Sequence, residues 1–594
     1  MKYLGVDYYP EQWGIEHLRD DLKSIQELGC NVIRIADFAW DIFEPEEGRY
    51  DFAFFDEVLK TVKEYGLHVI MCIPTATMPV WLYERYPEIM NEDETGYRQP
   101  FGARRGYCFN SEVYMEKARA LTRELITHYK GNDVIVAWQM DNEIGHEGSD
   151  MCYCESCKKA FHSYLEEKYD GDIRDLNERW GTHFWSHTYS SFKQIPLPRK
   201  AFVAQNPTLR LEWERFRSLS SERFIQMEYE TIKETDPNIP VIHDFSGGAF
   251  NKHQNPFAIA KHMDIVAYNN YPVWGGQSKA MEDYEIAFTL DFAHSFKHQN
   301  FWVTEAIMGA QGHDIIGKAP SPRQAIGWSR LAVEHGAESN IFFRYRGYNR
   351  GAEQYCFGIV DADNEKRRRY QETQQYFQLV KDAMPPLKKK EACILYDYDS
   401  AAAFRIQRQS DTMSYEGEAL KLYKQFFDKG ISVEFVQKDE DLSGYAYIVL
   451  PAMIIMDGEF KKKLKAAAKE GATVLMTFRT GWKDIDNNME FGKRLPADLD
   501  DLCGAVLEEH EALLTDQYLR VEYKGIEGKA EVFEECMTLR GGEAIISYKN
   551  SPFGEYAAVV RNPYGKGVCY YLGTSLEEKL LSMLIDDIIE ERKQ

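Results

Sequence analysis

The sequence predicts an α/β protein that begins with a (β/α)8 TIM barrel, followed by a smaller α/β domain and a small C-terminal β domain. Two observations predict the barrel. Short, almost continuously apolar segments alternate with amphipathic helical patterns over the first 385 residues, and eight such units follow one another. Strands that are apolar on both faces are typical of a parallel sheet covered by helices on both sides, and eight β/α units fit a closed barrel. An open, doubly wound sheet is the alternative, but nothing like G-x-G-x-x-G follows the first strand.

The strands of the barrel can be placed in order along the chain. The candidates are 3–10, 31–38, 68–75, 134–143, 240–245, 264–272, 301–306 and 340–346. Helical patterns between them include 17–29, 54–66, 115–131 and 323–337. The segment 144–220 is too long for an ordinary loop between a strand and the next helix, which is expected near Ser221. We therefore expect an excursion from the barrel at 144–220.

The pattern restarts after residues 381–392. Strand candidates at 391–400, 432–437, 445–452 and 472–478 alternate with helical patterns at 416–430 and 460–471. The last part contains β-rich stretches at 528–536, 543–550 and 556–573 before a final amphipathic helix. The predicted domains are therefore a catalytic barrel over 1–385, an α/β domain over 391–510 and a mainly β domain over 511–594.

Composition limits the class of partner. The formal charge of −24 argues against a nucleic-acid or acidic-membrane surface, which would need a basic patch. No stretch of about 18 apolar residues occurs, and no apolar segment of a signal peptide follows Lys2. We therefore expect a cytoplasmic protein that does not bind nucleic acid or membranes. The aromatic share of 14% suits sugar binding, where ring faces stack on C–H patches, but it also suits a large core.

Two candidate strands end in a glutamate, and the C-terminal ends of the strands are where barrel enzymes carry their chemistry. Glu143 ends the fourth strand and Glu305 the seventh. Glycoside cleavage needs two carboxyls, one that protonates the leaving oxygen and one that attacks the anomeric carbon, ~5–5.5 Å apart in retaining enzymes. Next to them, Asn142 could bond a sugar 2-hydroxyl and Tyr271 could hold Glu305. Either glutamate alone is better explained as a solvated charge or an ion-pair partner; the presence of both favours a glycosidase.

Several motifs add a resemblance to a known family. They are GVDYYPEQW (5–13), NVIRIADFAWDIFEPEEGRYDF (31–52), RRGYC (104–108), VAWQMDNEIG (136–145), FWVTEA (301–306) and RGAEQY (350–355). On these stretches the sequence resembles glycoside hydrolase family 42, a family of bacterial β-galactosidases, over essentially its whole length. The resemblance implies a barrel, a smaller α/β domain used for trimer contacts and a C-terminal β domain. It also implies that Glu143 is the acid/base, that Glu305 is the nucleophile and that Arg105 lies beside the substrate.

The sequence departs from the family pattern in the sugar-binding subsite. His313 stands where the family usually has a tryptophan, Tyr345 replaces the tryptophan of strand eight, and Cys356 replaces a histidine, whereas Glu353 is retained. The expected substrate is therefore a terminal β-D-galactoside or a close relative such as an α-L-arabinopyranoside. An endo-acting hydrolase of a β-glycan is an alternative. A non-catalytic sugar-binding protein is another, but a decayed site has no need for both glutamates.

Three cysteines cluster in the segment 144–220. Cys152, Cys154 and Cys157 form C-x-C-x2-C, and Cys108 follows the third strand, so its loop lies beside the loop after the fourth. Four thiolates make a closed tetrahedral zinc site, which would be structural because no position is open to water. The resemblance supports this site, because many family members carry a four-cysteine zinc site at these positions. The alternative is that the thiols are free.

Overall fold

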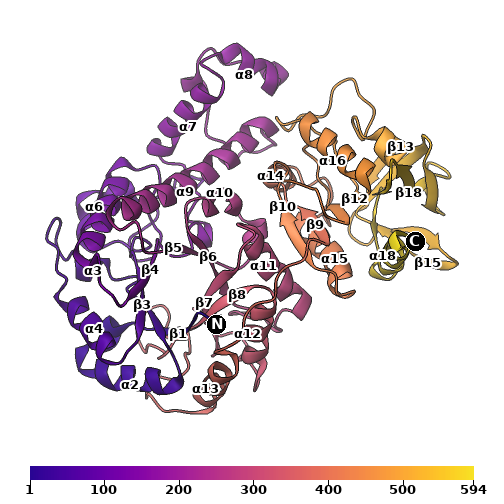
Figure 1. Cartoon of the computed structure of the whole chain (residues 1–594). Helices are drawn as coiled ribbons and strands as arrows, with labels where there is room; N and C mark the ends of the chain where they lie inside the picture. Colours follow the sequence, from indigo (N-terminus) through magenta and orange to yellow (C-terminus); the bar gives the residue numbers. More distant parts are fainter. Residues whose placement is uncertain (594) are drawn as a thin grey trace. The chain divides into compact units, whose positions relative to one another are not determined.

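The protein, described from a computed structural model over residues 1–593, forms two compact units. Unit 1 comprises Met1–Leu165 and Phe216–Leu387, and unit 2 comprises Glu166–Arg215 and the chain from Lys388 onward. Unit 1 therefore contains the expected barrel, and the middle of the predicted excursion belongs to unit 2. Figure 1 shows both units coloured along the chain.

Unit 1 is built around a closed barrel of eight parallel strands in sequence order, which confirms the predicted fold class. The strands are β1 (Tyr3–Asp7), β2 (Val32–Ile35), β3 (His68–Cys72), β4 (Ile135–Gln139), β5 (Val241–Phe245), β6 (Ile265–Asn270), β7 (Phe301–Ile307) and β8 (Ala337–Phe343). β2, β5 and β7 are buried along their whole length, as expected for parallel strands covered on both sides. Barrel closure is made by β1 and β8, where Leu4 pairs with Asn340.

One layer of apolar side chains fills the lower part of the barrel. Tyr3 packs against a cluster to which each of the other seven strands contributes one residue: Val32, Ile70, Ala137, Ile242, Ala267, Trp302 and Ile341. The barrel is thus a packed core and not a pore, as is usual for this fold.

Helices surround the barrel strands (Figure 1). The longer ones are α2 (Leu18–Leu28), α4 (Ala53–Glu64), α6 (Glu112–Tyr129), α9 (Pro207–Thr235), α11 (Asp283–Ser295), α12 (Gln324–Glu334) and α13 (Arg368–Val380). The shorter ones are α1 (Pro10–Trp13), α3 (Trp40–Phe43), α5 (Val80–Arg85) and α10 (Pro256–Ala260). α9 begins at Pro207 and not near Ser221 as predicted, because a proline is favoured in the first turn of a helix. The segment 144–220 also contains α7 (Glu155–Lys168) and α8 (Ile173–Trp180).

Unit 2 contains one large mixed sheet, whose main path runs β10-β9-β11-β12-β19-β18-β16-β13. Its strands are β9 (Ala392–Leu395), β10 (Val433–Val436), β11 (Tyr447–Leu450), β12 (Thr473–Thr477), β13 (Ala505–Ala512), β16 (Phe533–Leu539), β17 (Glu543–Ser547), β18 (Ala557–Tyr564) and β19 (Gly567–Leu572). Thr473 of β12 pairs in parallel with Val568 of β19. Strands from the predicted segments 391–510 and 511–594 therefore share one sheet.

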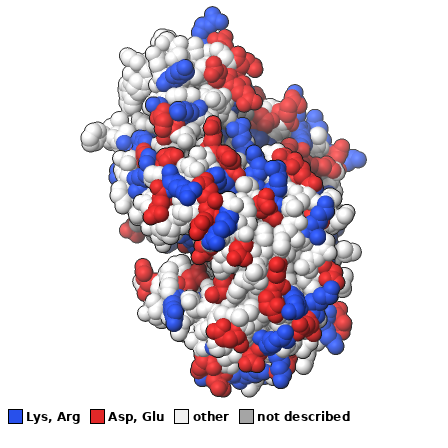
Figure 2. All heavy atoms as spheres, turned by 90° about the vertical axis from the view of Figure 1, so that its left-hand side faces the viewer, with Lys and Arg blue, Asp and Glu red and all other residues white. Residues whose placement is uncertain are grey.

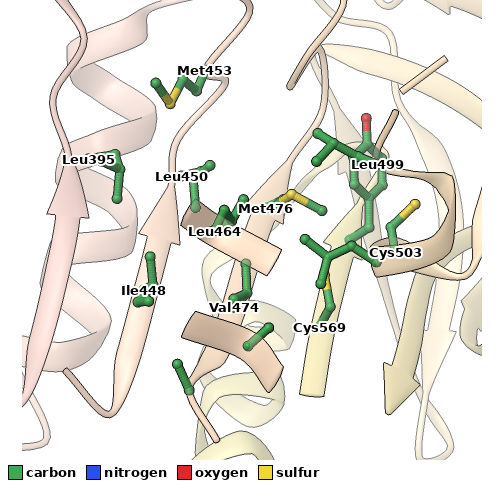
Figure 3. Close-up of a cluster of buried hydrophobic side chains, with 14 of the residues drawn as sticks. Leu395, Ile448, Leu450, Met453, Leu464, Val474, Met476, Leu499, Cys503 and Cys569 are labelled. Atoms are coloured by element: carbon green, nitrogen blue, oxygen red, sulfur yellow. The ribbon is translucent and has the colours of Figure 1, made fainter. Parts of the chain in front are cut away.

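Unit 2 also contains a small second sheet and several helices. A three-stranded sheet is formed by β14 (Leu519–Tyr523), β15 (Ile526–Glu531) and β20 (Ser575–Leu576). The helices are α14 (Tyr398–Ile406), α15 (Tyr415–Phe427), α16 (Gly458–Glu470), α17 (Asp500–Cys503) and α18 (Glu578–Lys593). Figure 3 shows a buried cluster in which Leu464 of α16 packs over Ile448 and Val474 of the sheet.

Charged side chains fasten the segment Glu166–Arg215 within unit 2. Arg179 makes two hydrogen bonds to Asp486, of 2.9 and 2.7 Å, and Arg215 makes two to Asp399, of 3.1 and 2.7 Å. Thr208 Oγ1 donates to the carbonyl of Asp486 at 2.6 Å. Paired, two-pronged arginine–carboxylate contacts fix geometry as well as charge, so this segment is held at defined points.

On the face shown in Figure 2, basic and acidic side chains are interspersed. Among the described residues, no helix has the length and apolar character needed to cross a bilayer.

Candidate active site

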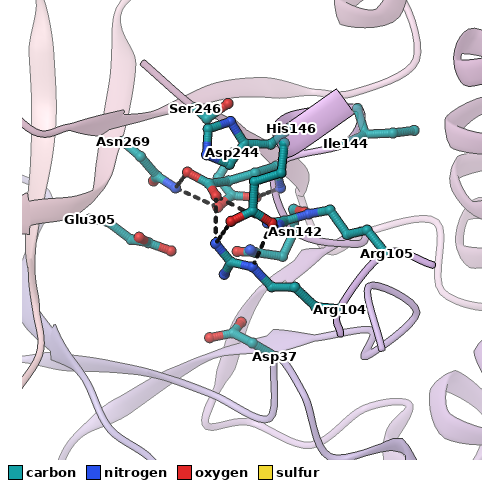
Figure 4. A network of polar contacts seen from close by, with 12 residues as sticks. Asp37, Arg104, Arg105, Asn142, Ile144, His146, Asp244, Ser246, Asn269 and Glu305 are labelled. Atoms are coloured by element: carbon teal, nitrogen blue, oxygen red, sulfur yellow. Dashed lines mark hydrogen bonds and ion pairs between the residues drawn. The ribbon is translucent and has the colours of Figure 1, made fainter. Parts of the chain in front are cut away.

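Glu305 lies inside β7 and points into a buried polar network (Figure 4). Its Oε1 accepts a hydrogen bond from Arg34 Nη1 at 3.1 Å, and its Oε2 accepts one from the Tyr271 hydroxyl at 2.6 Å. Only 6% of Glu305 is exposed. A guanidinium and a phenol therefore fix this carboxylate from two directions.

Arg34 is the centre of the network, and it is fully buried in β2. Its guanidinium donates to Gln139 at 2.7 Å, to Asn142 at 3.0 Å and to Asp244 at 3.3 Å. It also lies 2.9 Å from Asp7 and 3.1 Å from Asp37. A buried arginine surrounded by carboxylates holds those groups in one place, because removing either the arginine or a carboxylate would leave an unpaired buried charge.

Glu143 stands just after β4 and is held from the other side of the network. Its Oε2 accepts from Arg105 Nη2 at 3.0 Å, and Arg104 Nη2 lies 3.8 Å from the same oxygen. Its Oε1 accepts from Asn269 Nδ2 at 3.1 Å. Figure 4 shows Arg105 and Glu305 approaching the network from opposite sides.

The two glutamates are connected through one chain of contacts. Asn269 Nδ2 donates to both Glu143 Oε1 and Asp244 Oδ2, the latter at 2.8 Å, and Asp244 in turn contacts Arg34, which bonds Glu305. The structure thus brings together Glu143, Glu305 and Asn142, which the sequence placed at strand ends.

A second set of contacts runs between the glutamates at the mouth of the barrel. Trp274 packs edge-to-face on Tyr271, with ring centroids 5.1 Å apart, and on His313, at 5.7 Å. His313 Nε2 lies 4.0 Å from Glu353 Oε1, and Arg104 lies 3.5 Å from Glu353. Because Tyr271 bonds Glu305 and Arg104 approaches Glu143, these contacts form a second path from one glutamate to the other.

Burial and charge act differently on the two carboxyls. Burial raises the pKa of Glu305 well above its usual range, although the Arg34 charge opposes it. Burial also acts to raise the pKa of Glu143, but the positive charges of His146, Arg105 and Arg104 lower it overall. Burial lowers the pKa of His146 itself to about 4, so at neutral pH the lowering on Glu143 comes from Arg105, Arg104 and Lys252.

One of the expected substrate contacts, Tyr345, lies differently from the sequence-based expectation. The Tyr345 hydroxyl donates to Asn364 at 2.9 Å, and its ring packs on Tyr8, so this buried side chain points away from the glutamates. The aromatic residue of this strand end that reaches the site is Phe343, which clusters with Tyr9 and Cys356. Only Arg344 separates Phe343 from Tyr345, and the sequence did not show which of the two aromatic residues lies beside the glutamates.

Other residues of the site escaped the sequence analysis. Arg34 was visible as a charge within the apolar stretch NVIRIADF, a pattern that requires a buried partner. Asn269 was not singled out, although it follows Ala267 of the barrel core by two residues and so lies on the same face of β6.

The four predicted metal ligands are also together. The sulfur atoms of Cys108, Cys152, Cys154 and Cys157 all lie within 4.8 Å of one another, and all four residues are buried. Cys108 Sγ is 3.3 Å from Cys157 Sγ and 3.5 Å from Cys154 Sγ. Tetrahedral zinc with Zn–S bonds of ~2.3 Å would separate its sulfurs by about 3.8 Å, so the four thiols fit a metal ion.

Comparison with known proteins places the chain among glycosidases. Residues 7–383 match the family model of glycoside hydrolase family 42, described as β-galactosidase, and residues 390–594 match a β-galactosidase trimerisation domain. β-Galactosidase BgaA of Clostridium cellulovorans is 29% identical over 99% of this chain and 89% of its own length. A β-galactosidase of Thermus thermophilus is 33% identical over 83% of this chain and 77% of its own.

Solved structures agree. The β-galactosidase of the Antarctic haloarchaeon Halorubrum lacusprofundi has a TM-score of 0.94 at 30% identity, covering 100% of this chain and 90% of that one. An exo-β-1,4-mannosidase from an Opitutaceae bacterium has a TM-score of 0.63 at 13% identity and shares only the fold. The chain belongs to glycoside hydrolase family 42.

Proposed function

We propose that the protein is a retaining glycoside hydrolase that removes terminal β-D-galactosyl residues by double displacement. The observation that carries this proposal is that Glu143, which follows β4, and Glu305, in the last part of β7, are joined by a single buried network. The similarity to β-galactosidases over the whole chain supports the reaction and the sugar class.

In the first step, Glu305 attacks the anomeric carbon, and the bond to the leaving oxygen breaks as Glu143 gives that oxygen a proton. In the second step, Glu143 takes a proton from water, whose oxygen replaces Glu305 at the same carbon. Arg34 and Tyr271 hold Glu305 in line for attack through the two hydrogen bonds described above.

Glu143 has to be protonated for the first step, whereas the two arginines lower its pKa. We propose that sugar hydroxyls recruit Arg105, which donates to Glu143 at 3.0 Å. Loss of that contact would raise the pKa of Glu143, because a positive neighbour favours the ionised form. Substrate binding would then favour the protonated form of Glu143, which the first step requires.

The sugar subsite is proposed to use Arg105, Asn142, Tyr271 and Glu353. His313 Nε2 is shielded from solvent and has no hydrogen-bond partner among the described residues, and it faces Glu353 at 4.0 Å. A sugar hydroxyl between them can accept from the imidazole and donate to the carboxylate. The position of Tyr345 gives no support for a contact of its side chain with the sugar.

Nuclear magnetic resonance of a fresh reaction tests the proposal. With nitrophenyl β-D-galactoside as substrate, the first product should be β-galactose, which only later equilibrates with the α anomer. Appearance of α-galactose first would contradict double displacement. Faster cleavage of the α-L-arabinopyranoside would assign that sugar, and not β-galactose, as the substrate. If only a polysaccharide were cleaved, with release of reducing ends, the endo-acting alternative would be favoured.

We propose that the four cysteines hold structural zinc. Four sulfur ligands leave no open position for water, so the ion would take no part in the reaction. It would join the loop after β3, which carries Cys108, to the segment that follows Glu143.

We further propose that the enzyme is a cytoplasmic homotrimer. The match of residues 390–594 to a trimerisation domain supports the trimer. None of the eleven cysteines is in a disulfide bond, which suits a reducing compartment.

A further inference from the structure

A second pair of carboxyls lies buried behind the loop that carries Glu143. Asp141 follows β4 and Glu228 is on α9, and neither residue is exposed to solvent. Thr75, which follows β3, lies between them: its Oγ1 is 3.1 Å from Asp141 Oδ2 and 2.6 Å from Glu228 Oε1. Neither carboxyl has an assigned part in the reaction described above.

One hydrogen has to serve two contacts at Thr75. A threonine hydroxyl carries a single hydrogen and can donate it to only one carboxylate. The second short contact is a hydrogen bond only if that carboxyl is protonated and donates to the Thr75 oxygen. At least one of the two acids is therefore neutral.

The surroundings identify Glu228 as the neutral acid. Asp141 Oδ2 accepts a further hydrogen bond from the Tyr107 hydroxyl at 2.8 Å, which favours its ionised form. One oxygen of each acid, Asp141 Oδ1 and Glu228 Oε2, makes no hydrogen bond. Burial raises the pKa of Asp141 too, but its hydrogen bonds and the Arg105 charge oppose this. Glu228 differs in that Thr75 is its one hydrogen-bond partner among the described residues, where it has no ion-pair partner. An ionised carboxylate so placed would be strongly unfavourable. Burial and the nearby Asp141 both raise the pKa of Glu228 well above its usual range.

The contacts of Asp141 matter because the backbone around it is unusual. Asp141 and Glu143 have φ angles of 43° and 50°, on either side of Asn142. This left-handed backbone conformation costs a residue other than glycine ~1–3 kcal/mol, so it persists only where surrounding contacts hold it. Tyr107 and Thr75 bond the Asp141 side chain, and Gln139 donates to its carbonyl at 3.1 Å.

We propose that Glu228 is a positioning residue for the acid/base: as a neutral carboxylic acid it donates to Thr75, which donates to Asp141 and so fixes the turn that presents Asn142 and Glu143. This inference rests on the proposed glycosidase function. It predicts an effect on proton donation by Glu143 and not on attack by Glu305, because Glu305 is held separately by Arg34 and Tyr271.

The test compares Glu228→Leu, Glu228→Gln and the control Glu230→Leu, which changes an exposed glutamate on the same helix. Glu228→Leu should lower kcat/KM, which reports the first step, on alkyl galactosides by about 10- to 100-fold, because these have poor leaving groups. Its kcat/KM on dinitrophenyl galactoside, whose leaving group needs no acid, should change little. Glu228→Gln keeps a donor and should recover most of the lost activity.

Equal losses on both substrates, or no loss on either, would overturn the inference. If Glu228→Leu does not fold, infrared difference spectroscopy of the wild type against Glu228→Gln remains. At neutral pH it should show loss of a protonated carboxylic acid, and loss of a carboxylate band instead would overturn the inference. A wild type that cleaves no glycoside would refute the proposed function itself and is distinguishable from both results.

Discussion

Arg34 shows how a single side chain organises this site. It lies within about 3.3 Å of Asp7, Asp37, Asp244 and Glu305, all buried or nearly so. Burial raises the pKa of Asp244 to about 7, although the Arg34 charge opposes it. Such a cluster is stable only as a whole, because loss of one partner from a buried ion pair costs ~3–5 kcal/mol. The network therefore places Glu305 rigidly enough for attack on one carbon.

Replacement of Glu143 by alanine should separate its role from that of Glu305. Loss of a general acid costs about 10²- to 10⁴-fold when the leaving group needs a proton. We expect Glu143→Ala to lose activity of this order on lactose or alkyl galactosides. The first step with dinitrophenyl galactoside should be far less affected. Equal loss of the first-step rate on both kinds of substrate would contradict the acid/base assignment.

His313 gives a test of the sugar subsite. His313→Phe keeps an aromatic ring against Trp274 and removes the nitrogen that faces Glu353. We expect kcat/KM on the β-galactoside to fall about tenfold, the loss of one hydrogen bond. On the deoxygalactoside that lacks the contacted hydroxyl, wild type and variant should be equal. A uniform ratio across the 3-, 4- and 6-deoxy sugars would contradict the contact.

The glutamates could be predicted from the sequence because each ends an apolar strand, and strand ends share one face of a barrel. The side chains around them could not all be predicted. The β6–β7 pairing leaves one extra residue in β7 just before Glu305, and the choice between Phe343 and Tyr345 depends on how the chain leaves β8. Both are decided by tertiary packing and leave no periodic signal.

At the scale of elements, the loops after β3 and β4 meet at the cysteine cluster. Cys108 comes from the first loop, Cys152 and Cys154 from the segment leading into α7, and Cys157 from the first turn of α7. A metal ion held by all four would join the two loops and the start of this helix.

Removal of one ligand tests the metal. Elemental analysis of the wild type, purified without chelators, should find about one zinc per chain. Cys152→Ser should bind far less zinc and melt at a lower temperature, because metal binding to such sites contributes to folding. The control Cys30→Ser changes a buried cysteine outside the cluster and should retain zinc. Absence of zinc from the wild type would refute the proposal.

Helices and strands were predictable where the apolar period was strong, as in α2, α4 and α12. The start of α9 was not, because residues 207–220 of this helix show no single apolar face that periodicity could detect. Its first turn is marked by Pro207, a signal that the sequence offered.

At the scale of the whole molecule, the large sheet of unit 2 joins strands that are distant in the chain. β12 and β19 pair although about 95 residues separate them. Sequence pattern gave the strands of both segments but not this pairing, because a pattern of local period carries no information on long-range partners.

The assembly can be measured directly. A trimer of the 69.1-kDa chain should sediment at about 207 kDa, three times that mass. Dilution over a wide range of concentration should leave the mass unchanged if the interfaces are extensive. A mass of a single chain at all concentrations would contradict the proposed trimer.

Attack by Glu305 on the anomeric carbon is the central claim, and chemical rescue tests it most directly. Glu305→Ala should lose activity by on the order of 10⁴-fold or more. Added azide, filling the space of the missing carboxylate, should restore turnover of dinitrophenyl β-galactoside and yield α-galactosyl azide. Wild-type activity of the variant would contradict the account. Formation of β-galactosyl azide alone, from the substrate in the presence of azide, would contradict it too.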